Sequence, residues 1–529
     1  MTNKMLSLHF ILYCIITISV AVLIALIFTA CSPLTKIEHD TKTTYTPQYN
    51  VFDSPIATPY QNELREGKDG ALIIADGTSA LLHRLAFIQM AQKSIDIQTY
   101  IYKNELTSKL LIHELLEAAS RGVKIRILID DNGITNDLYD LIQLDNHPNV
   151  EVRIFNPYFF RFTILRAFEA PFDFARINKR MHNKLFIFDD TALIMGGRNI
   201  GDEYFDNASV NFTDTDLLFI GNITKDSRLN FEEFWNYNRS IPLSFFPSKS
   251  KLKKYHKRTL KEQAKAYNIN EKQWLEYRAD IESFKGKYLN KELKMSFGEG
   301  IFLADLPQKV DINNADSKTL ILDALSYYLN YAKDSIIISS SYLVPGNASM
   351  EFWQDFLNRG VKIQILTNSL ASIDVVPVYS HWEHYRDKLA KMGIEVYEYT
   401  NLDVNKAKLK DKAKFYNTKK ARVSLHSKSM IIDDSIIAVG SFNLDYRSAM
   451  LNTESIVFFK SSDLASELKK ITQHQMAESY RILYDATLKK CVWQLRIDGD
   501  EQTFTKPPNT SFWLRLYKNA AKILPEKLF

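Results

Sequence analysis

The sequence contains little cysteine, and its cysteines are poorly placed for disulfides or metal binding. There are three, Cys14, Cys31 and Cys491, and only Cys491 lies in the body of the chain. A disulfide within the body is therefore excluded. Because the sequence also has no cysteine pairs and no histidine-rich cluster, it offers no recognisable zinc site. We accordingly expect neither a metal nor a cofactor.

The sequence also lacks a strong charge imbalance. Over 529 residues the formal net charge is only +5, which identifies no binding partner by itself. The composition, 46% apolar and 24% charged, is ordinary for a globular protein. Because the chain is too long for one ordinary core, we expect two or more packed units.

Charged residues are absent from one long N-terminal run, residues 10–30. The run is long enough to span a bilayer as a helix, and it ends at Cys31 in a pattern that resembles a bacterial lipoprotein cleavage site. Acylation of Cys31 and an uncleaved transmembrane anchor both remain open. Because Lys4 favours the cytoplasmic side, we expect a bacterial envelope protein whose body is exported and membrane-anchored, on the periplasmic side.

One short motif occurs twice in the chain. Each copy has a histidine, then a lysine two positions later and an aspartate seven positions later, with small residues and an asparagine following at matching distances. One copy would arise by chance roughly once in 10^4 positions, but chance is a poor explanation for two copies with the same downstream spacing. The residues are His182, Lys184, Asp189, Gly197 and Asn199, and His426, Lys428, Asp433, Ser441 and Asn443.

Each copy of the motif predicts a strand hairpin. Residues 184–188 and 428–432 are mostly apolar, and alternation along a strand puts the histidine and the lysine on one face. The aspartates are turn residues that lead into second apolar runs, 192–195 and 436–439. The histidine and lysine of each copy are therefore expected to share a functional face.

A wider repeat surrounds the two motifs. The paired segments recur 238 to 244 positions apart in a βαβ-type pattern, which predicts duplicated α/β lobes with largely buried sheets. Each lobe would supply one histidine to a single site. The matching segments are 91–97 with 332–338, 121–130 with 359–368, and 150–155 with 394–399.

The composition changes along the chain predict six segments. A tether rich in Thr, Pro and Lys follows the anchor, and a Lys- and Glu-rich connector with helical spacing separates the lobes. Near the end, residues 512–524 mix large apolar and basic groups; a bilayer-surface helix fits this pattern, but we expect a helix packed on the second lobe. The segments are 1–31 (signal or anchor), 32–60 (tether), 61–240 (first lobe), 241–300 (helical basic connector), 301–485 (second lobe) and 486–529 (C-terminal extension).

The double motif is similar to that of the phospholipase D superfamily, in which two HKD motifs join at the interface of two lobes. Residues 181–205 resemble the bacterial cardiolipin synthase C group, and the superfamily resemblance covers most of the chain. It implies an α/β fold of two duplicated phospholipase D-like α/β sandwich lobes with a shared active site at their interface. Residues 378–382 depart from the subgroup's Val-His-x-Gly-Tyr pattern, which leaves the acceptor preference open.

The resemblance also implies roles for the paired residues. One histidine forms a covalent phosphohistidine while the other acts as acid and base; by analogy we assign His182 as the nucleophile and His426 as the acid and base, although the sequence alone permits the reverse. Each histidine is expected to be oriented by an acidic residue that follows its own motif, and the best matches are Asp216 and Glu454. The phosphoryl oxygens would be bound by Lys184, Lys428, Asn199 and Asn443, helped by Ser441 and the backbone at Gly197.

Asp189 and Asp433 complete the two catalytic motifs, but we expect them to order their hairpins rather than to touch the substrate. The leading functional hypothesis is a phosphatidyl transferase that makes cardiolipin from phospholipid donors. The alternatives are a phospholipase D that hydrolyses phospholipids to phosphatidic acid, and a phosphodiesterase or nuclease of the same superfamily. Membrane attachment favours phospholipid substrates and a membrane as partners, and we expect no nucleic acid.

Overall fold

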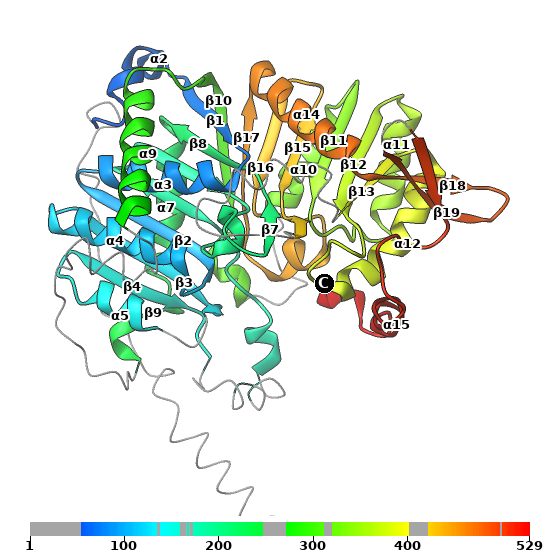
Figure 1. Ribbon diagram of the computed structural model, residues 1–529, viewed down its shortest axis with the longest axis horizontal. Helices are drawn as coiled ribbons and strands as arrows, with labels where there is room; N and C mark the ends of the chain where they lie inside the picture. The colour runs from blue at the N-terminus through cyan, green and yellow to red at the C-terminus, as the bar shows by residue number, and fades with distance from the viewer. Residues whose placement is uncertain are drawn as a thin grey trace, which may run out of the picture.

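The computed structural model describes residues 54–134, 138–158, 166, 169, 173–246, 271–311, 320–400, 422–497 and 500–529 (Figure 1). The expected N-terminal anchor, Cys31 and most of the expected tether lie outside these residues. Within the described ranges, no helix is both long enough and apolar enough to cross a bilayer.

The first lobe is a mixed sheet covered by helices. Its strands lie in the order β1-β8-β6-β5-β2-β3-β4-β9; β2, β3 and β4 are parallel to one another and the other neighbours are antiparallel. The strands are β1 (Asp69–Ile74), β2 (Ser94–Tyr102), β3 (Lys124–Ile134), β4 (Val150–Phe155), β5 (Leu185–Phe188), β6 (Ala192–Gly196), β8 (Asp216–Ile220) and β9 (Ser240–Pro242). The helices are α2 (Gln61–Arg65), α3 (Gly77–Met90), α4 (Leu106–Ser120), α5 (Tyr139–Asp145), α7 (Ile223–Trp235) and α9 (Glu271–Leu289).

The second lobe repeats this order strand for strand and extends it. The sheet runs β10-β17-β16-β15-β11-β12-β13-β18-β19-β20. The strands are β10 (Ser296–Ala304), β11 (Ser335–Ser340), β12 (Lys362–Asn368), β13 (Glu395–Tyr399), β15 (Lys428–Ile432), β16 (Ile436–Gly440), β17 (Ser455–Lys460), β18 (Tyr480–Asp485), β19 (Lys490–Ile497) and β20 (Asp500–Phe504). The helices are α10 (Leu320–Asn330), α11 (Ser349–Asn358), α12 (Val376–Met392), α14 (Ser462–Ala477) and α15 (Phe512–Ala521). The predicted duplication of α/β lobes is confirmed.

Strand β5 is apolar throughout, and β15 is apolar from Met430 to Ile432, because both faces of each sheet are covered. Along β5, Phe186 and Phe188 face the outer core of the first lobe, whereas Leu185 and Ile187 face the core between the two sheets. A strand buried on both faces reads as a continuous apolar run. The same alternation occurs in β15, where Met430 and Ile432 face the outer core of the second lobe and Ile431 faces the shared core.

The two lobes are joined by strands as well as by packing. The start of β10 pairs antiparallel with β1, so that the two sheets form one continuous 18-stranded sheet. A second link pairs β7 (Val210–Thr213) of the first lobe in parallel with β14 (Arg422–Leu425) of the second. Helices α7 and α14 also contribute to the core between the sheets. The interface is therefore a folded core rather than a loose contact between domains.

The structure moves two of the expected segment boundaries. Helix α9 lies in the expected connector but packs on α3, and its residues Tyr277, Ile281 and Tyr288 are buried in the core of the first lobe. The second sheet also does not end at residue 485, because β19 and β20 continue it. The connector thus contributes to the first lobe, and the expected C-terminal extension begins inside the second.

Candidate active site

The two motif histidines are positioned by backbone contacts that cross between the lobes. The His182 N–H donates to the carbonyl of Thr453 at 2.9 Å, and the His426 N–H donates to the carbonyl of Thr213 at 2.7 Å. In each motif, the residue between the histidine and the lysine adds a side-chain hydrogen bond to the other lobe. Asn183 accepts a hydrogen bond from the Thr453 hydroxyl, and Ser427 donates one to Thr215.

Each histidine contacts a carboxylate from the other lobe. His182 Nδ1 lies 2.8 Å from Glu454 Oε2, and His426 Nδ1 lies 2.6 Å from Asp214 Oδ2. The expectation that an acidic residue serves the histidine of its own motif was therefore wrong. The orienting carboxylates are exchanged, because β7 and β14 pair across the interface and bring Asp214 beside His426. Neither half of the site is complete within one lobe.

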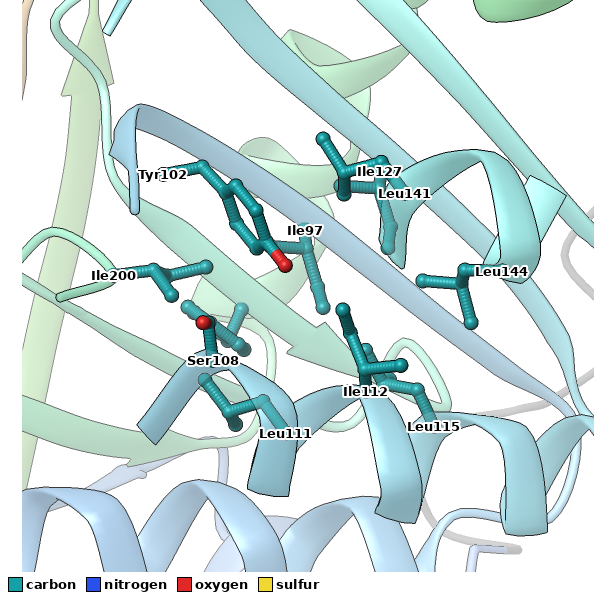
Figure 2. Close-up of a pocket in the computed structure, with 11 residues that line it drawn as sticks. Ile97, Tyr102, Ser108, Leu111, Ile112, Leu115, Ile127, Leu141, Leu144 and Ile200 are labelled. Carbon is teal, nitrogen blue, oxygen red and sulfur yellow. The ribbon is translucent and has the colours of Figure 1, made fainter. Parts of the chain in front are cut away.

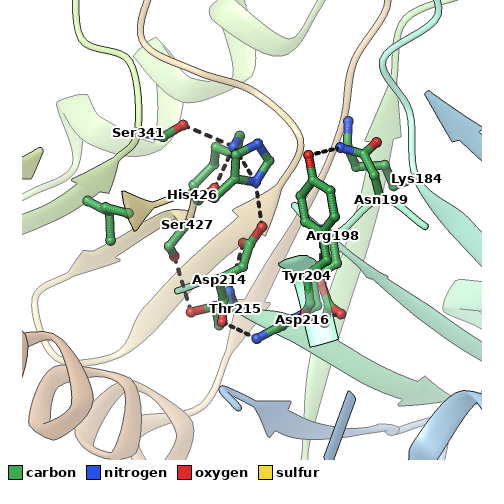
Figure 3. A network of polar contacts seen from close by, with 12 residues as sticks. Lys184, Arg198, Asn199, Tyr204, Asp214, Thr215, Asp216, Ser341, His426 and Ser427 are labelled. Atoms are coloured by element: carbon green, nitrogen blue, oxygen red, sulfur yellow. Dashed lines mark hydrogen bonds and ion pairs between the residues drawn. The ribbon is translucent and has the colours of Figure 1, made fainter. Parts of the chain in front are cut away.

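Asp216 is not an orienting residue, and this prediction was wrong by two positions. In the first lobe Gly196 pairs with Asp216, and in the second the matching Gly440 pairs with Ile456. The counterpart of Glu454 is consequently Asp214, two residues before Asp216. The Asp216 carboxylate instead accepts from Arg84 at 2.8 Å and lies 3.3 Å from Arg198, and all three side chains are buried. Figure 3 shows Asp216 and Arg198.

Burial sets the protonation states of the two imidazoles. It lowers the pKa of His182 to about 4, although the neighbouring Glu454 carboxylate opposes the shift. Burial also lowers the pKa of His426 well below its usual value, and the charge of Lys428 adds to that effect. Because a carboxylate only accepts, each neutral ring carries its proton on Nδ1 and keeps the Nε2 lone pair available for attack.

The two lysines lie in the same buried cluster as the histidines. Lys184 Nζ donates to the carbonyl of His182 at 2.6 Å, and Lys428 Nζ donates to the Ser341 hydroxyl at 3.0 Å. Burial lowers the pKa of Lys184 to about 7 and also lowers that of Lys428. The charge of Lys184 lowers the pKa of His426, and the charge of Lys428 lowers the pKa of His182. The two halves are therefore electrostatically coupled. An anionic phosphodiester would restore the lysine pKa values by supplying the missing negative charge.

The remaining residues predicted to bind the phosphoryl group act in this structure on their protein neighbours. Asn199 Oδ1 accepts from the Ile101 N–H and its Nδ2 donates to the Tyr204 hydroxyl, while Asn443 Oδ1 accepts from Ser341. The Ser441 hydroxyl donates to Glu454 at 2.5 Å. A Cβ added to Gly197 would lie 2.4 Å from an Asp214 carboxylate oxygen. Ser441 and Gly197 thus occupy matching places, each against an orienting acid.

Asp189 and Asp433 lie at the far ends of their strands and contact backbone. The Asp189 carboxylate accepts the N–H groups of Gln92, Lys93 and Ser94. Asp433 does the same for residues 333–335. Both aspartates have positive φ, as do the residues that follow them, which suits the tight turn of a hairpin. They fix the motif hairpin to the neighbouring strand, which agrees with the expectation that they order the hairpins rather than touch the substrate.

Sequence reasoning missed the aromatic residues that surround the imidazoles. Tyr100 lies edge-on to His182 with ring centres 5.0 Å apart, and Tyr204 and Phe212 lie 5.3 and 5.1 Å from His426. Figure 3 shows Tyr204 between His426 on one side and Lys184 and Asn199 on the other. Tyr204 belongs to the run that resembles the family, but its role depends on a fold that brings residues 204 and 426 together.

Arg198 was also missed, although it lies next to Asn199. Its guanidinium is fully buried and donates to the backbone carbonyls of Asp214 at 2.6 Å and Tyr204 at 3.1 Å. It therefore holds two residues that contact His426. The second lobe has Phe442 at the equivalent position, 244 residues later.

An apolar cavity in the first lobe is separate from this site. It lies between α4 and the sheet and is lined mainly by aliphatic side chains, with Tyr102 and Ser108 among them (Figure 2). Its enclosed volume of about 10 Å³ is at the lower limit for one water molecule. None of the motif residues lines it, so we assign it no part in catalysis.

Comparisons with known proteins agree with the duplicated fold. Residues 85–235 and 325–476 match the family described as "Cardiolipin synthase, PLD-like domain". The chain is 34% identical over 481 residues to cardiolipin synthase C of Escherichia coli K12, covering 87% of this chain and 96% of that protein. It is 41% identical over 486 residues to an uncharacterized protein of Helicobacter pylori strain J99, covering 90% and 93%. The solved structure of phosphatidylserine synthase from Haemophilus influenzae matches 90% of this chain and 100% of that one, with a TM-score of 0.55 at 13% identity.

Proposed function

We propose a specific reaction from one premise: the chain belongs to the phospholipase D-like cardiolipin synthase family and is an enzyme of phospholipid metabolism. The proposed activity is a phosphatidyl transferase that makes cardiolipin from phospholipid donors. One observation carries the proposal. Two neutral imidazoles, each held by a buried carboxylate from the other lobe, share one cluster with two buried lysines.

In the first half-reaction, His182 Nε2 attacks the phosphorus of the donor and the bond to the head-group oxygen breaks. His426 gives that oxygen a proton, so that the head group leaves as a neutral alcohol. His426 must first gain this proton, and the negative charge of the bound diester favours its protonation. The diacylglycerol phosphate stays on His182 as a phosphohistidine.

The second half-reaction reverses these steps with a new alcohol. His426, now unprotonated, takes the proton of a hydroxyl on a second phospholipid, and that oxygen attacks the phosphohistidine. The bond from phosphorus to His182 breaks and cardiolipin is released. Throughout, Lys184 and Lys428 offset the charge on the nonbridging oxygens. If water takes the place of the lipid hydroxyl, the product is phosphatidic acid.

The products formed by purified protein test this proposal. Mixed vesicles with isotopically labelled phosphatidylglycerol should yield labelled cardiolipin, identified by mass spectrometry. The His182→Ala variant should yield none and serves as the matched control. Phosphatidic acid as the sole product over a range of lipid concentrations would instead assign a hydrolase.

We also propose that the body is exported and attached to the membrane, because residues 10–30 are uncharged and end at Cys31. If Cys31 is acylated, Cys31→Ser should accumulate a larger precursor without lipid label. Intact mass and labelling with a fatty acid distinguish the two anchors. An intact N-terminal peptide together with an unlabelled Cys31 in the wild-type protein would assign residues 10–30 as a transmembrane helix.

A further inference from the structure

The C-terminal helix α15 exposes its large apolar residues. Phe512 is 64% exposed, Trp513 74%, Leu516 48% and Tyr517 54%. At about 100° per residue, these four positions fall within one arc of roughly 140° on the helix surface. Just beyond the helix, Ile523 is 86% exposed. Single exposed apolar residues are common, but a contiguous face of this kind marks an interaction surface.

The opposite face of α15, which contacts the protein, is partly charged. Lys518 is buried, and its ammonium lies 2.7 Å from the Glu383 carboxylate of α12; Lys522 lies 2.8 Å from the same carboxylate. Burial would raise the pKa of Glu383, but the two lysines bring it below the usual value. Leu514 adds a contact with the core of the second lobe. A helix packed only for stability would place its apolar face inward, so α15 has the reverse orientation.

From this reversed packing we infer that the exposed face of α15 is a membrane-docking surface that lies in the headgroup region of an anionic bilayer. Trp and Tyr favour this region, because it is apolar on one side and wet on the other. Lys518 and Lys522 are paired with Glu383, but three further basic residues of the stretch 505–529, Lys506, Arg515 and Lys527, outnumber its one acidic residue, Glu526. This balance attracts anionic lipids. A protein partner or a second copy of the chain would need no such excess of positive charge.

The docking surface is connected to the active-site region in two places. Helix α12, which α15 contacts, begins two residues after Asp374, a carboxylate that acts electrostatically on His426. The chain after α15 returns to the lobe interface, where Arg447 donates to the Leu528 carbonyl at 3.1 Å. Figure 1 shows α15 beside α12, with the C-terminus lying toward the interface between the lobes. Docking through α15 would therefore set the orientation of the site relative to the bilayer.

Fluorescence of Trp513 tests the contact directly. The full-length protein is reconstituted in vesicles of about equal parts phosphatidylglycerol and phosphatidylcholine, with and without bromine on the acyl chains. The measurement uses a Trp274→Phe background, and the other four tryptophans, Trp235, Trp353, Trp382 and Trp493, are buried. In that background we expect Trp513→Phe to remove most of the quenching by brominated lipid. Equal quenching in the variant and the wild type would overturn the inference. This measurement is independent of which reaction the enzyme catalyses.

Kinetics provide the second test. The double variant Leu516→Ser, Tyr517→Ser should lose about tenfold in rate on anionic vesicles, while hydrolysis of a soluble phosphodiester stays within about twofold. The control is Tyr327→Ser, Tyr331→Ser on and next to α10, a comparably exposed aromatic pair, which should leave both rates unchanged. An unchanged vesicle rate in the α15 variant, or an equal loss on the soluble substrate, would overturn the inference. So would a fall in oligomeric state by light scattering, which would assign the face to a second copy.

Discussion

The two halves of the active site share a histidine and a lysine but differ in the residues that surround them. His182 has Glu454 behind it, and Glu454 accepts a hydrogen bond from Ser441. His426 has the shorter Asp214 behind it, which lies against Gly197 where a hydroxyl is impossible. Both halves thus place a carboxylate at the histidine Nδ1. One half uses a glutamate beside a serine, and the other uses a shorter aspartate beside a glycine.

The pKa values of the two carboxylates are also shifted in opposite directions. Burial alone would raise the pKa of Glu454, but its contacts with His182, Lys184 and Ser441 bring that pKa below its usual value. The pKa of Asp214 stays above its usual value because burial dominates there. Duplication of the motif therefore does not duplicate the environment, which suits two histidines with different tasks. The following experiments test this asymmetry.

Replacing either histidine by alanine should have the largest effect, a loss of at least about 10^3-fold in turnover, because each half-reaction needs both imidazoles. A phosphoenzyme should accumulate in His426→Ala and be absent from His182→Ala, as detected by mass spectrometry after rapid quenching. The exposed His474 of α14 provides the matched control, since His474→Ala should leave turnover unchanged. Accumulation in His182→Ala alone would exchange the two roles.

Asp214→Asn and Asp216→Asn should separate catalysis from folding although the residues are two positions apart. Asp214→Asn should lower kcat by roughly 10^2- to 10^4-fold, because the tautomer and position of His426 are no longer held. Asp216→Asn should lower the free energy of unfolding by about 3–5 kcal/mol, since it leaves Arg84 and Arg198 without their carboxylate.

Denaturant titration and kcat per folded molecule measure these two effects. A folded Asp216→Asn enzyme that has lost as much activity as Asp214→Asn would contradict the assignment.

Ser441→Ala should lower kcat by about tenfold, because it removes a charge-assisted hydrogen bond worth roughly 1.5–3 kcal/mol from Glu454. Its counterpart in the first lobe already lacks a side chain, so Gly197→Ala should act differently, by pushing the Asp214 carboxylate away from His426. Steady-state kinetics on a soluble diester compare the two variants. If Ser441→Ala has no effect, the hydroxyl contributes nothing to the difference between the halves.

The smallest effect concerns pH. Burial lowers the pKa of Lys184 to about 7 and that of His182 to about 4. In the free enzyme Lys184 therefore loses its charge as the pH rises through about 7, and kcat/KM, which reports free-enzyme groups, should fall above that pH. Between pH 5 and 6, His182 is already neutral and imposes no loss.

The pH profiles of kcat/KM and kcat should differ in a defined way. Bound phosphodiester raises the pKa of Lys184, so the alkaline fall in kcat should begin at higher pH. If kcat and kcat/KM began to fall at the same alkaline pH, Lys184 would not be the titrating group.

The sequence by itself determined the duplicated α/β lobes, the motif hairpins and the meeting of two histidines and two lysines. These features follow from apolar runs, turn residues and a constant repeat spacing, all of which are local or directly repeated signals. Such signals could not predict that α9 packs on α3, because the two helices are far apart in the sequence. They also could not predict that the sheet continues after residue 485, because that depends on the pairing of β19 with β18.

Only the tertiary structure decided which acid serves which histidine. Asp214 and Asp216 are equally acidic and flank one threonine, so composition cannot distinguish them. Asp216 begins β8, where it pairs with Gly196 and its carboxylate contacts Arg84, whereas Asp214 precedes the strand and contacts His426. The crossing of β7 and β14 then delivers Asp214 to a histidine 212 residues away. Register and crossing both arise from pairing between segments far apart in the chain, for which a single sequence carries no local signal.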